Sequence, residues 1–444
     1  MNIGIIGAGV AGLTAAYDLA RAGHTATVYE AAPQAGGLAS GFRDERWEWP
    51  LERFYHHIFT TDKAIIDLTN AIGFGDKLMF RGPVTAQWWQ GRGVPLDSPA
   101  RVLRFGGIPF PDRVRFGMAI AYLKYVTNDW RTLERDTADA WSRRWMGEPA
   151  YRTLIRPLLE GKFGPYADEV NMAWLWSRFK ARSFKLGYYA GGFQGFSDAL
   201  AEAVRRQGAT VHLQTPISAL EQLPEGGWRI VPPAGPAATF DAVLVTGAPG
   251  LLGKLAPQLP PDYLGRLRSL RSMGAVVMTI ALTKPLTDGL YWVNMPKDQF
   301  PFLALVEHTN FIESSHYGGD HLIYCGDYLD PSHEYFSMSQ DELLERFIPA
   351  LQKVNPRFER GWVRKVWLHR ETYAQPIVPV GHSSAIPPIP TPLPGLFWAS
   401  MSQVYPWDRG TNFAVELGQQ AARAIGSAAL PSRPGVSTAT TTSS

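Results

Sequence analysis

Apolar and polar residues at the start of the chain follow a pattern that predicts a strand, a turn and a helix. Residues 2–6 form a short apolar run, and apolar residues then recur at helical intervals from Leu13 to Leu19. Gly23 suits the end of that helix, and residues 25–29 resume the period-two pattern of a second strand. The sequence therefore predicts a βαβ unit closed within about thirty residues, as a dinucleotide-binding fold requires.

Three glycines between the first strand and the helix have the spacing G-x-G-x-x-G. The first allows a tight turn, the second lets a diphosphate approach the backbone, and the third lets the helix pack closely on the strand. Glu30 ends the second strand, where its carboxylate can accept hydrogen bonds from ribose hydroxyls and would repel the 2′-phosphate of NADP. We predict that the turn binds a nucleotide cofactor through Gly7, Gly9, Val10, Ala11 and Gly12.

The residues after Glu30 carry a more specific resemblance. Gly36, Gly37 and Leu38 follow a short spacer, with Ser40 close behind. Together with Glu30, this motif resembles the FAD superfamily that contains amine oxidases, protoporphyrinogen oxidases, phytoene desaturases and UDP-galactopyranose mutases. The resemblance implies one bound FAD, with the backbone of residues 36–38 close to its diphosphate and flavin.

An aromatic stretch rich in histidine follows at residues 47–62. It resembles the segment beside the isoalloxazine ring in these flavoproteins, and His57-Ile58-Phe59 resembles the histidine motif of the mutases. Adjacent histidines in a strand point to opposite faces, so at most one of His56 and His57 is expected to face the ring. His57 is our candidate for cofactor contact and catalysis; the alternative is that one histidine is structural and the other exposed. We expect no metal site, since no carboxylate or cysteine cluster accompanies them.

Residues 96–181 show helical patterns rich in Arg, Phe and Trp. Pro111 and Asp112 open a helix whose residues 114–126 are nearly all apolar. Further helical patterns lie at residues 141–145, 151–159 and 172–179. We predict an inserted helical domain, which in the resembling families roofs the substrate cavity or touches a membrane.

Later segments resemble the superfamily's return to the nucleotide domain. A helix is predicted at residues 197–207, followed by strands at 210–213 and 241–246. The resemblance implies that the segment ending at Ile217 passes the adenine. It also implies that a closing helix at residues 413–425 points its N-terminus at the flavin pyrimidine edge and stabilises negative charge there. Cofactor contacts are then expected at Thr411, Asn412 and Phe413, with Thr411 or Asn412 as the helix cap.

Five segments in the second half of the chain alternate or run apolar like strands. No helix is expected between them, so a largely antiparallel substrate domain is the natural interpretation. His308 and Tyr328 are polar groups in these strands and are our further catalytic candidates, although such residues are more often satisfied core groups. Cys325 lies in a predicted strand far from either FAD motif, so we expect FAD to be bound without a cysteine link.

The predicted fold class is α/β, with a discontinuous Rossmann-like FAD-binding domain, an antiparallel β-sheet substrate domain and a helical insert. The tail is rich in Ser, Thr, Pro and Ala, which predicts disorder. The expected FAD-binding parts are residues 1–75, 183–255 and 390–426, with the insert at 76–182, the substrate domain at 256–389 and the tail at 427–444.

Composition limits the class of protein. At 444 residues, with 45% hydrophobic content, the chain can bury a full core, and its net charge of +3 gives no global sign of nucleic-acid binding. The single cysteine excludes a disulfide framework and agrees with a reducing cytoplasm. We expect no export signal, because the first apolar residues belong to the nucleotide fold. We expect no spanning helix, because no apolar run reaches about eighteen residues.

These motifs predict an FAD-dependent oxidoreductase that oxidises or desaturates a hydrophobic small molecule by hydride transfer to flavin, as protoporphyrinogen oxidases or polyene desaturases do. The alternative is a non-redox sugar-nucleotide mutase, which only the His57 motif supports. A protein that merely holds FAD is a third interpretation. An NAD-only dehydrogenase would be favoured if the protein bound no flavin.

Residues 100–124 indicate how such a substrate arrives. Five basic residues against Asp112 leave a charge of +4, and apolar residues such as Phe110 and Met118 are interleaved with them. A helix of this kind can lie in the headgroup region of an anionic membrane. We therefore expect a cytoplasmic protein that contacts the cytoplasmic face of a membrane; the alternative is an amphipathic helix packed on its own domain.

Overall fold

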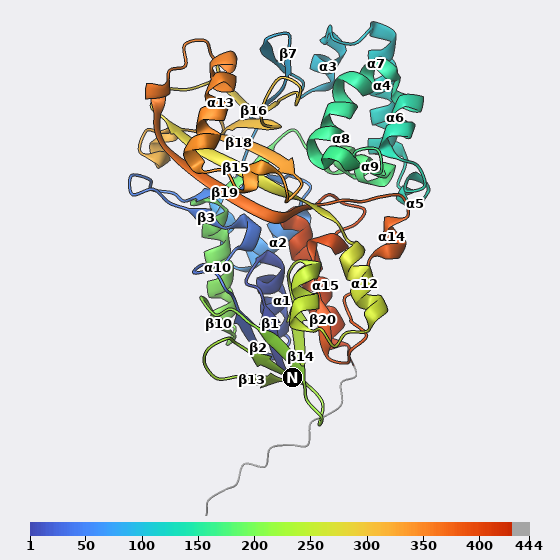
Figure 1. Cartoon of the computed structure of the whole chain (residues 1–444), viewed down its shortest axis with the longest axis vertical. Helices are drawn as coiled ribbons and strands as arrows, with labels where there is room; N and C mark the ends of the chain where they lie inside the picture. Colours follow the sequence, from blue (N-terminus) through green and yellow to red (C-terminus); the bar gives the residue numbers. More distant parts are fainter. Residues whose placement is uncertain (429–444) are drawn as a thin grey trace, which may run out of the picture.

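A five-stranded parallel sheet forms the centre of the lower lobe in Figure 1, and its strands come from widely separated parts of the chain. Its order is β10-β2-β1-β14-β20. The strands are β1 (Asn2–Ile6), β2 (Thr25–Tyr29), β10 (Thr210–His212), β14 (Ala242–Val245) and β20 (Leu396–Trp398). The structure is a computed structural model that describes residues 1–428, so the expected tail lies outside the described residues from position 429 onward.

Helices cover one face of this sheet, and a small antiparallel sheet with two helices covers the other. The first layer contains α1 (Val10–Arg21), α2 (Lys63–Ala71), α10 (Gly192–Arg206) and α15 (Thr411–Gly426). The second contains β11 (Ala219–Gln222), β12 (Trp228–Val231), β13 (Ala238–Phe240), α11 (Pro249–Leu255) and α12 (Pro261–Ser269). Gly4 of β1 makes room for the second layer, because a Cβ at that position would overlap Ile230.

A seven-stranded sheet forms the upper lobe, in the order β19-β15-β18-β17-β16-β7-β8. Its neighbours pair antiparallel, except that β16 and β7 are parallel, which confirms the largely antiparallel sheet. The strands are β7 (Val84–Trp89), β8 (Arg92–Pro95), β15 (Ser272–Leu282), β16 (Leu290–Asn294), β17 (Ala304–Glu307), β18 (His321–Leu329) and β19 (Val363–Pro376).

A helix that we did not expect packs on the upper sheet. α13 (Gln340–Val354) lies between β18 and β19, and its Phe347 is buried in the same core cluster as residues of the sheet. Ser339 accepts a hydrogen bond from the Glu342 N–H, and the Glu342 carboxylate accepts one from the Ser339 N–H. The prediction of strands without intervening helices is therefore wrong here, because the sheet needs this helix to cover its apolar face.

Two boundaries also differ from the predicted ones. α10 begins at Gly192, five residues before the expected position 197, after a turn in which Gly191 adopts φ +86°. β17 ends at Glu307, so His308 lies in the 3-10 helix η6 (His308–Asn310) and not in a strand. At the end of the strand, the Glu307 carboxylate accepts hydrogen bonds from the N–H groups of Leu286 and Thr287.

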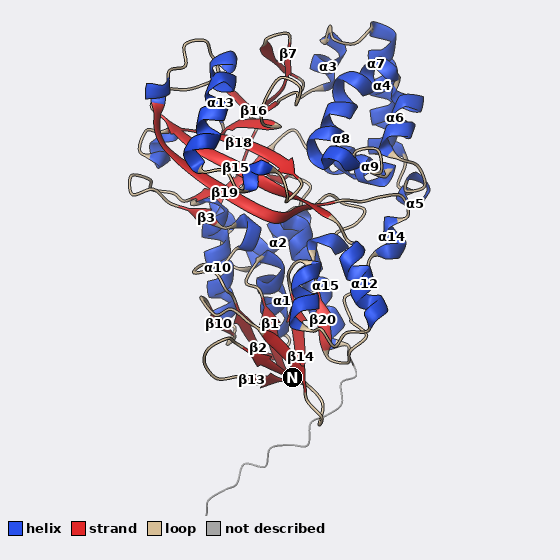
Figure 2. Ribbon diagram, in the orientation of Figure 1, coloured by secondary structure: helices blue, strands red, loops and turns tan. Residues whose placement is uncertain are grey.

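The predicted helical insert stands beside the upper sheet (Figure 2). Its first half contains α3 (Pro99–Arg104), α4 (Phe110–Ala121), which continues as the π-helix η3 (Tyr122–Val126), α5 (Trp130–Leu133) and α6 (Ala138–Met146). Its second half contains α7 (Glu148–Ala150), the π-helix η4 (Tyr151–Ile155), α8 (Arg156–Phe163) and α9 (Met172–Ala181). Within residues 1–428, no helix is both long and apolar enough to cross a bilayer.

Short elements join the lobes. β5 (Ile58–Phe59) and β6 (Leu78–Arg81) pair with β9 (Leu186–Tyr189), and β3 (Gly41–Phe42) pairs with β4 (Leu51–Glu52). The remaining short helices are η1 (Gly37–Ala39), η2 (Gly75–Lys77), η5 (Gly164–Tyr166), η7 (Ser314–Tyr317), η8 (Glu334–Phe336), η9 (Arg360–Trp362), α14 (His382–Ala385) and η10 (Met401–Gln403).

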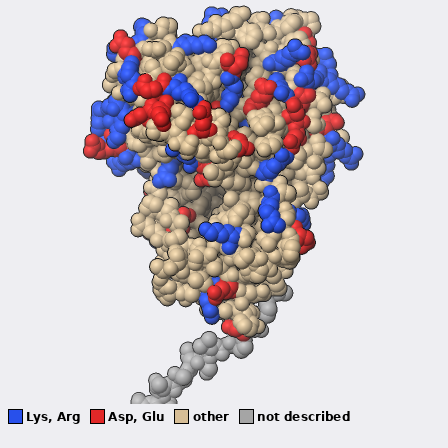
Figure 3. Space-filling model, viewed as in Figure 1, with Lys and Arg blue, Asp and Glu red and all other residues tan. Residues whose placement is uncertain are grey.

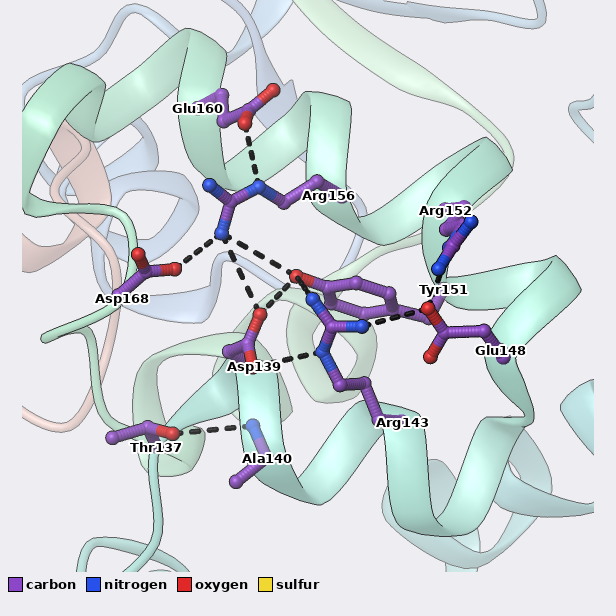
Figure 4. A network of polar contacts seen from close by, with 10 residues as sticks. All are labelled: Thr137, Asp139, Ala140, Arg143, Glu148, Tyr151, Arg152, Arg156, Glu160 and Asp168. Atoms are coloured by element: carbon purple, nitrogen blue, oxygen red, sulfur yellow. Dashed lines mark hydrogen bonds and ion pairs between the residues drawn. The ribbon is translucent and has the colours of Figure 1, made fainter.

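A network of charged groups ties the helices of the insert together (Figure 4). The Tyr151 hydroxyl donates to Asp139, which also pairs with Arg143 at 3.0 Å. Arg156 of α8 forms ion pairs with both Asp139 and Asp168.

Charged side chains are more frequent on the upper lobe than on the lower one in the face shown in Figure 3, so the nucleotide domain presents the less charged surface there.

Close packing of α1 on α15 gives the first prediction. A Cβ on Gly418 of α15 would lie 2.8 Å from the Thr14 Cβ and closer still to the Ala11 carbonyl oxygen. Gly418→Ala should therefore destabilise the protein by about 1–3 kcal/mol, as overpacking does. The control is Gly265→Ala in α12, where the Cβ meets open space and should stabilise by about 0.5–1 kcal/mol. Thermal unfolding measures both, and equal Tm values for the two variants would contradict the packing argument.

Candidate FAD and substrate site

Glycine backbone forms the expected nucleotide turn between β1 and α1. Gly7 adopts φ +105°, and a Cβ on Gly12 would overlap the Gly7 carbonyl oxygen. Gly9 pairs with Gly36 in an isolated bridge, and a Cβ on Gly37 would lie 3.2 Å from the Gly9 Cα. The two glycine motifs therefore meet backbone to backbone, as a cradle for a diphosphate requires.

The start of α1 presents N–H groups to this cradle. Gly9 is the N-cap, and no side chain caps the helix. The Leu13 N–H donates to the Gly9 carbonyl at 3.0 Å, so the N–H groups of Val10, Ala11 and Gly12 precede the first intrahelical bond. N–H groups at the positive end of a helix bind phosphate. The turn therefore fits the diphosphate of FAD.

Glu30 lies where the ribose is expected. Its Oε2 accepts from the Ala8 N–H at 2.8 Å, and its Oε1 accepts from the Ala32 N–H at 2.9 Å. Each carboxylate oxygen keeps a further lone pair for a ribose hydroxyl. The Glu30 carbonyl accepts from the Thr215 N–H at 2.7 Å, which brings the segment leading to Ile217 alongside. Ile217 itself packs against the core beneath the small sheet.

The start of α15 is a second helix end without a side-chain cap. Its N-cap is Gly410, so the prediction that Thr411 or Asn412 caps the helix is wrong. The Asn412 Oδ1 instead accepts from the Ile65 N–H at 3.1 Å and so joins α15 to α2. The N–H groups of the first turn remain available for a ligand.

The other two cofactor candidates, Leu38 and Phe413, lie in η1 and in the first turn of α15. Leu38 is half-buried in η1, directly after the paired glycines. Phe413 stacks on Trp407, with the ring centroids 5.6 Å apart. Neither side chain offers a polar contact, so each contributes shape and backbone position.

Residues 55–57 run past the residues that precede α15. The His56 Nδ1 lies 2.6 Å from the Phe54 carbonyl oxygen, and burial lowers the His56 pKa to about 4. Burial, followed by the positive charge of Arg182, lowers the pKa of His57 to about 3. The buried His57 Nδ1 has no hydrogen-bond partner among residues 1–428. Both imidazoles are therefore neutral at physiological pH.

Tyr328 lies close to two basic side chains. Its hydroxyl accepts a hydrogen bond from Arg409, and the Lys162 Nζ lies 4.7 Å from its ring centroid. Arg178 and Arg182 lie near the same place. Burial has the largest effect in lowering the pKa of Lys162, and the positive charges of these two arginines lower it further. We call Lys162, Arg178, Arg182 and Arg409 the cation cluster.

Asp408 is the carboxylate inside the cation cluster. Its Oδ2 pairs with Arg178 at 2.5 Å, and its Oδ1 accepts from the Trp174 Nε1 at 3.1 Å. Burial alone would raise the Asp408 pKa, but the nearby cations hold it well below its usual range. No pattern in the sequence predicted this cluster. The available signal was Arg178 and Arg182 four residues apart at the end of a predicted helix.

His308 lies apart from these groups. It is buried, its Nε2 lies 2.7 Å from the Tyr317 hydroxyl, and its ring contacts Tyr188. Burial lowers its pKa to about 3. The structure thus brings His57 and Tyr328 to the same cation cluster and places His308 in the core.

A buried carboxylate that the sequence analysis also missed joins several elements. The Glu52 carboxylate accepts from the Tyr188 hydroxyl at 2.9 Å and from the Phe193 N–H at 2.7 Å. The Glu52 carbonyl accepts from the Tyr324 hydroxyl of β18 at 2.9 Å. Burial raises the Glu52 pKa to about 7. The β4 strand is thereby tied to α10, β9 and the upper sheet.

The parallel sheet, the paired glycine motifs and the separate antiparallel sheet together define an FAD-binding fold. The chain belongs to the flavin-containing amine oxidoreductase family, whose sequence profile matches residues 10–426. It is therefore an FAD-dependent oxidoreductase, and FAD is its cofactor.

Relatives of known activity match only short parts of the chain. A 15-cis-phytoene desaturase of Synechococcus elongatus is 30% identical over 112 residues, which is 25% of this chain and 22% of that protein. A hydroxysqualene dehydroxylase of Sinorhizobium fredii is 36% identical over 87 residues, 20% of each chain. The chain thus aligns with about a fifth of the length of these two relatives.

Solved structures match the whole fold. A protein assigned as a protoporphyrinogen oxidase, from Exiguobacterium, superposes with TM-score 0.72 at 19% identity and covers 96% of this chain and 98% of its own. A reduced UDP-galactopyranose mutase has TM-score 0.74 at 17% identity and covers 97% and 96%. A putrescine oxidase variant has TM-score 0.73 at 15% identity and covers 96% and 98%. At these identities the likeness concerns the fold.

The Glu30 contacts give the second prediction. Glu30→Ala removes the ribose acceptor and frees the Ala8 and Ala32 N–H groups, so FAD affinity should fall about 10- to 100-fold, the range for hydrogen bonds to a charged group. Titration of the apoprotein with FAD, followed by flavin fluorescence, measures the change. Glu225→Gln, an exposed glutamate, is the control. Wild-type affinity in Glu30→Ala would contradict the assignment.

Proposed function

We propose that this enzyme oxidises or desaturates a hydrophobic small molecule, in the manner of a protoporphyrinogen oxidase or a polyene desaturase. When bound, FAD supplies the acceptor for a hydride from the substrate. The observation that carries the proposal is the aromatic wall beside His57. The Trp292 ring lies 6.0 Å from the His57 ring, and the Tyr55 ring lies 4.9 Å from Trp292. Such a wall favours an apolar substrate because its burial removes apolar surface from water.

The side chains at this wall are suited to orient a substrate and exclude water. A His57 pKa of about 3 makes the imidazole a poor general base at physiological pH. Burial raises the pKa of Tyr55 well above its usual value, so its hydroxyl stays protonated. Positioning then supplies most of the rate. The partial matches to a phytoene desaturase and a hydroxysqualene dehydroxylase support this substrate class.

The third prediction tests the reaction class by anaerobic stopped-flow absorbance. A porphyrinogen or a polyene precursor should bleach the flavin of the oxidised holoenzyme, whereas a primary alkylamine should do so more slowly because the cations near His57 repel an ammonium group. Turnover that appears only after dithionite reduction, with a sugar nucleotide as substrate, would replace the proposal with the mutase alternative. No reduction by any of these substrates would reject it.

We also propose that the enzyme contacts anionic membranes through α4 and η3. One side of this helix packs inward through Phe116 and Leu123. The opposite side exposes large apolar residues, with Phe110 61%, Met118 63% and Tyr125 74% exposed. Several large apolar side chains exposed on one side of a surface helix mark an interaction site.

Neighbouring segments extend this face and surround it with positive charge. Exposed Trp145 adjoins α4, because its carbonyl accepts from the Arg115 Nε at 3.1 Å. Exposed Phe184 follows Arg182, whose carbonyl accepts from the Lys124 Nζ at 2.6 Å. Basic residues around exposed aromatic and aliphatic side chains suit an anionic bilayer surface. We call this region the α4 surface.

The fourth prediction concerns the α4 surface. Met118→Asp replaces a 63% exposed apolar side chain with a carboxylate, so partitioning onto anionic liposomes should fall about tenfold or more. Leu251→Asp, on α11 of the lower lobe, is the matched control and should bind like the wild type. Sedimentation at low and high salt measures the bound fraction. Equal recovery of wild-type protein in the supernatant with anionic and neutral liposomes at low salt would reject the proposal.

A further inference from the structure

The cation cluster carries more positive charge than its carboxylate neutralises. Lys162, Arg178, Arg182 and Arg409 interact electrostatically with Asp408, so three guanidinium groups and the Lys162 amine share a single carboxylate. Asp408 already accepts hydrogen bonds from four donors, about the number that a carboxylate can accept. A single carboxylate therefore cannot pair with every cation of the cluster.

Lys162 is the clearest case of an incompletely satisfied cation. Its residue is 8% exposed, and its Nζ has a hydrogen bond to the Gln375 Oε1 at 3.3 Å and a contact with the Tyr328 ring. An ammonium has three donors, and a buried cation without a paired carboxylate is unfavourable. Burial, with the nearby arginines, lowers the Lys162 pKa well below its usual value. An incoming anion would pair with this charge and accept from its free donors.

Arg182 supplies a further guanidinium at the same place, and burial lowers the pKa of this group below its usual value. It follows α9 one helical turn after Arg178, and it retains solvent-accessible surface. No hydrogen bond or ion pair joins its guanidinium to another residue of the described chain, 1–428, whereas Arg178 is held by Asp408. The planar fork of a guanidinium matches a carboxylate or a phosphate bidentately. The unpaired His57 Nδ1 faces the same cations and offers one more polar atom.

We infer that the substrate carries an anionic oxygen group, a carboxylate or a phosphate, that binds Lys162, Arg178 and Arg182 while its apolar part lies along the aromatic wall. The inference rests on the proposed function, because it names the polar end of the same hydrophobic substrate. Arg182 also connects the site to the α4 surface through its carbonyl bond with Lys124. An amphiphile can then enter from a bilayer with its charged end leading into the cluster.

The diphosphate of FAD is not the anion in question. The glycine turn at the start of α1 in the lower lobe would hold it, whereas Lys162 and Arg178 belong to α8 and α9 of the insert (Figure 1). Arg409 is held by the Ala374 carbonyl and the Tyr328 hydroxyl, so it positions Tyr328 and is not counted among the anion ligands.

The test titrates the oxidised holoenzyme with sodium decanoate, decyl phosphate and 1-decanol and follows the perturbation of the flavin absorption spectrum. One or both anions should bind about 10- to 100-fold more tightly than the alcohol, as charged hydrogen bonds predict. The tighter of the two anions identifies the group. Arg182→Gln should remove most of this preference, and Lys162→Met provides a second variant should the first not fold. Lys185→Gln, an exposed lysine on the same segment, should keep the full preference.

Three results would overturn the inference. Equal affinity for the anions and the alcohol would show that the cluster does not distinguish an anionic group from a neutral one. A preference that survives in both Arg182→Gln and Lys162→Met would place the anion elsewhere. A shift of the flavin reduction potential in these variants, without loss of anion preference, would assign the cations to the reduced flavin. Because the titration needs no turnover, failure of the oxidation chemistry would leave its outcome readable.

Discussion

Contact between backbones at glycine is the constraint on which the nucleotide domain depends. The helix α1 starts directly on the turn because Gly12 has no Cβ to strike the Gly7 carbonyl, and α15 reaches α1 through Gly418. The paired glycines approach the same turn, where a Cβ on Gly37 would lie 3.2 Å from the Gly9 Cα. The glycines let a diphosphate approach the N–H groups at the start of α1 closely, so these positions set the geometry of the nucleotide site.

The two lobes are joined by a buried polar contact as well as by the chain. Glu52 lies under the junction and accepts hydrogen bonds from Tyr188 and from the first turn of α10, while its carbonyl binds Tyr324 of the upper sheet. Its raised pKa of about 7 follows from burial without a paired cation. Folding therefore favours the protonated carboxyl, and this contribution to stability is lost as pH rises from the usual glutamate pKa of 4.5 to about 7.

The substrate side of the molecule combines three surfaces of different chemistry. The α4 surface is apolar and rimmed by cations, the wall beside His57 is aromatic, and the cation cluster around Asp408 has an excess of positive charge. The Lys124 bond to the Arg182 carbonyl connects the first surface to the third. Together they suit a substrate with a long apolar part and one acidic end, in which the apolar part supplies affinity and the acidic end supplies orientation.

The sequence alone determined the nucleotide half of the protein. Fixed spacing carries that information: the glycine turn, Glu30 and the paired glycines act through local backbone geometry, so they can be read within forty residues of the chain. The strands of the upper sheet were predicted from segments that alternate or run apolar, and their antiparallel arrangement was inferred because no helices were expected between them. The helix α13 was missed although its Ser339 and Glu342 capping box is local, because the apolar strands around it dominated the pattern.

Only the tertiary structure decided the substrate side. Lys162, Arg182 and Asp408 are far apart in sequence and become one site through packing, whereas His308, polar in an apolar run, is satisfied by Tyr317 in the core. Burial and charge excess are properties of that packing, and no local pattern contains them.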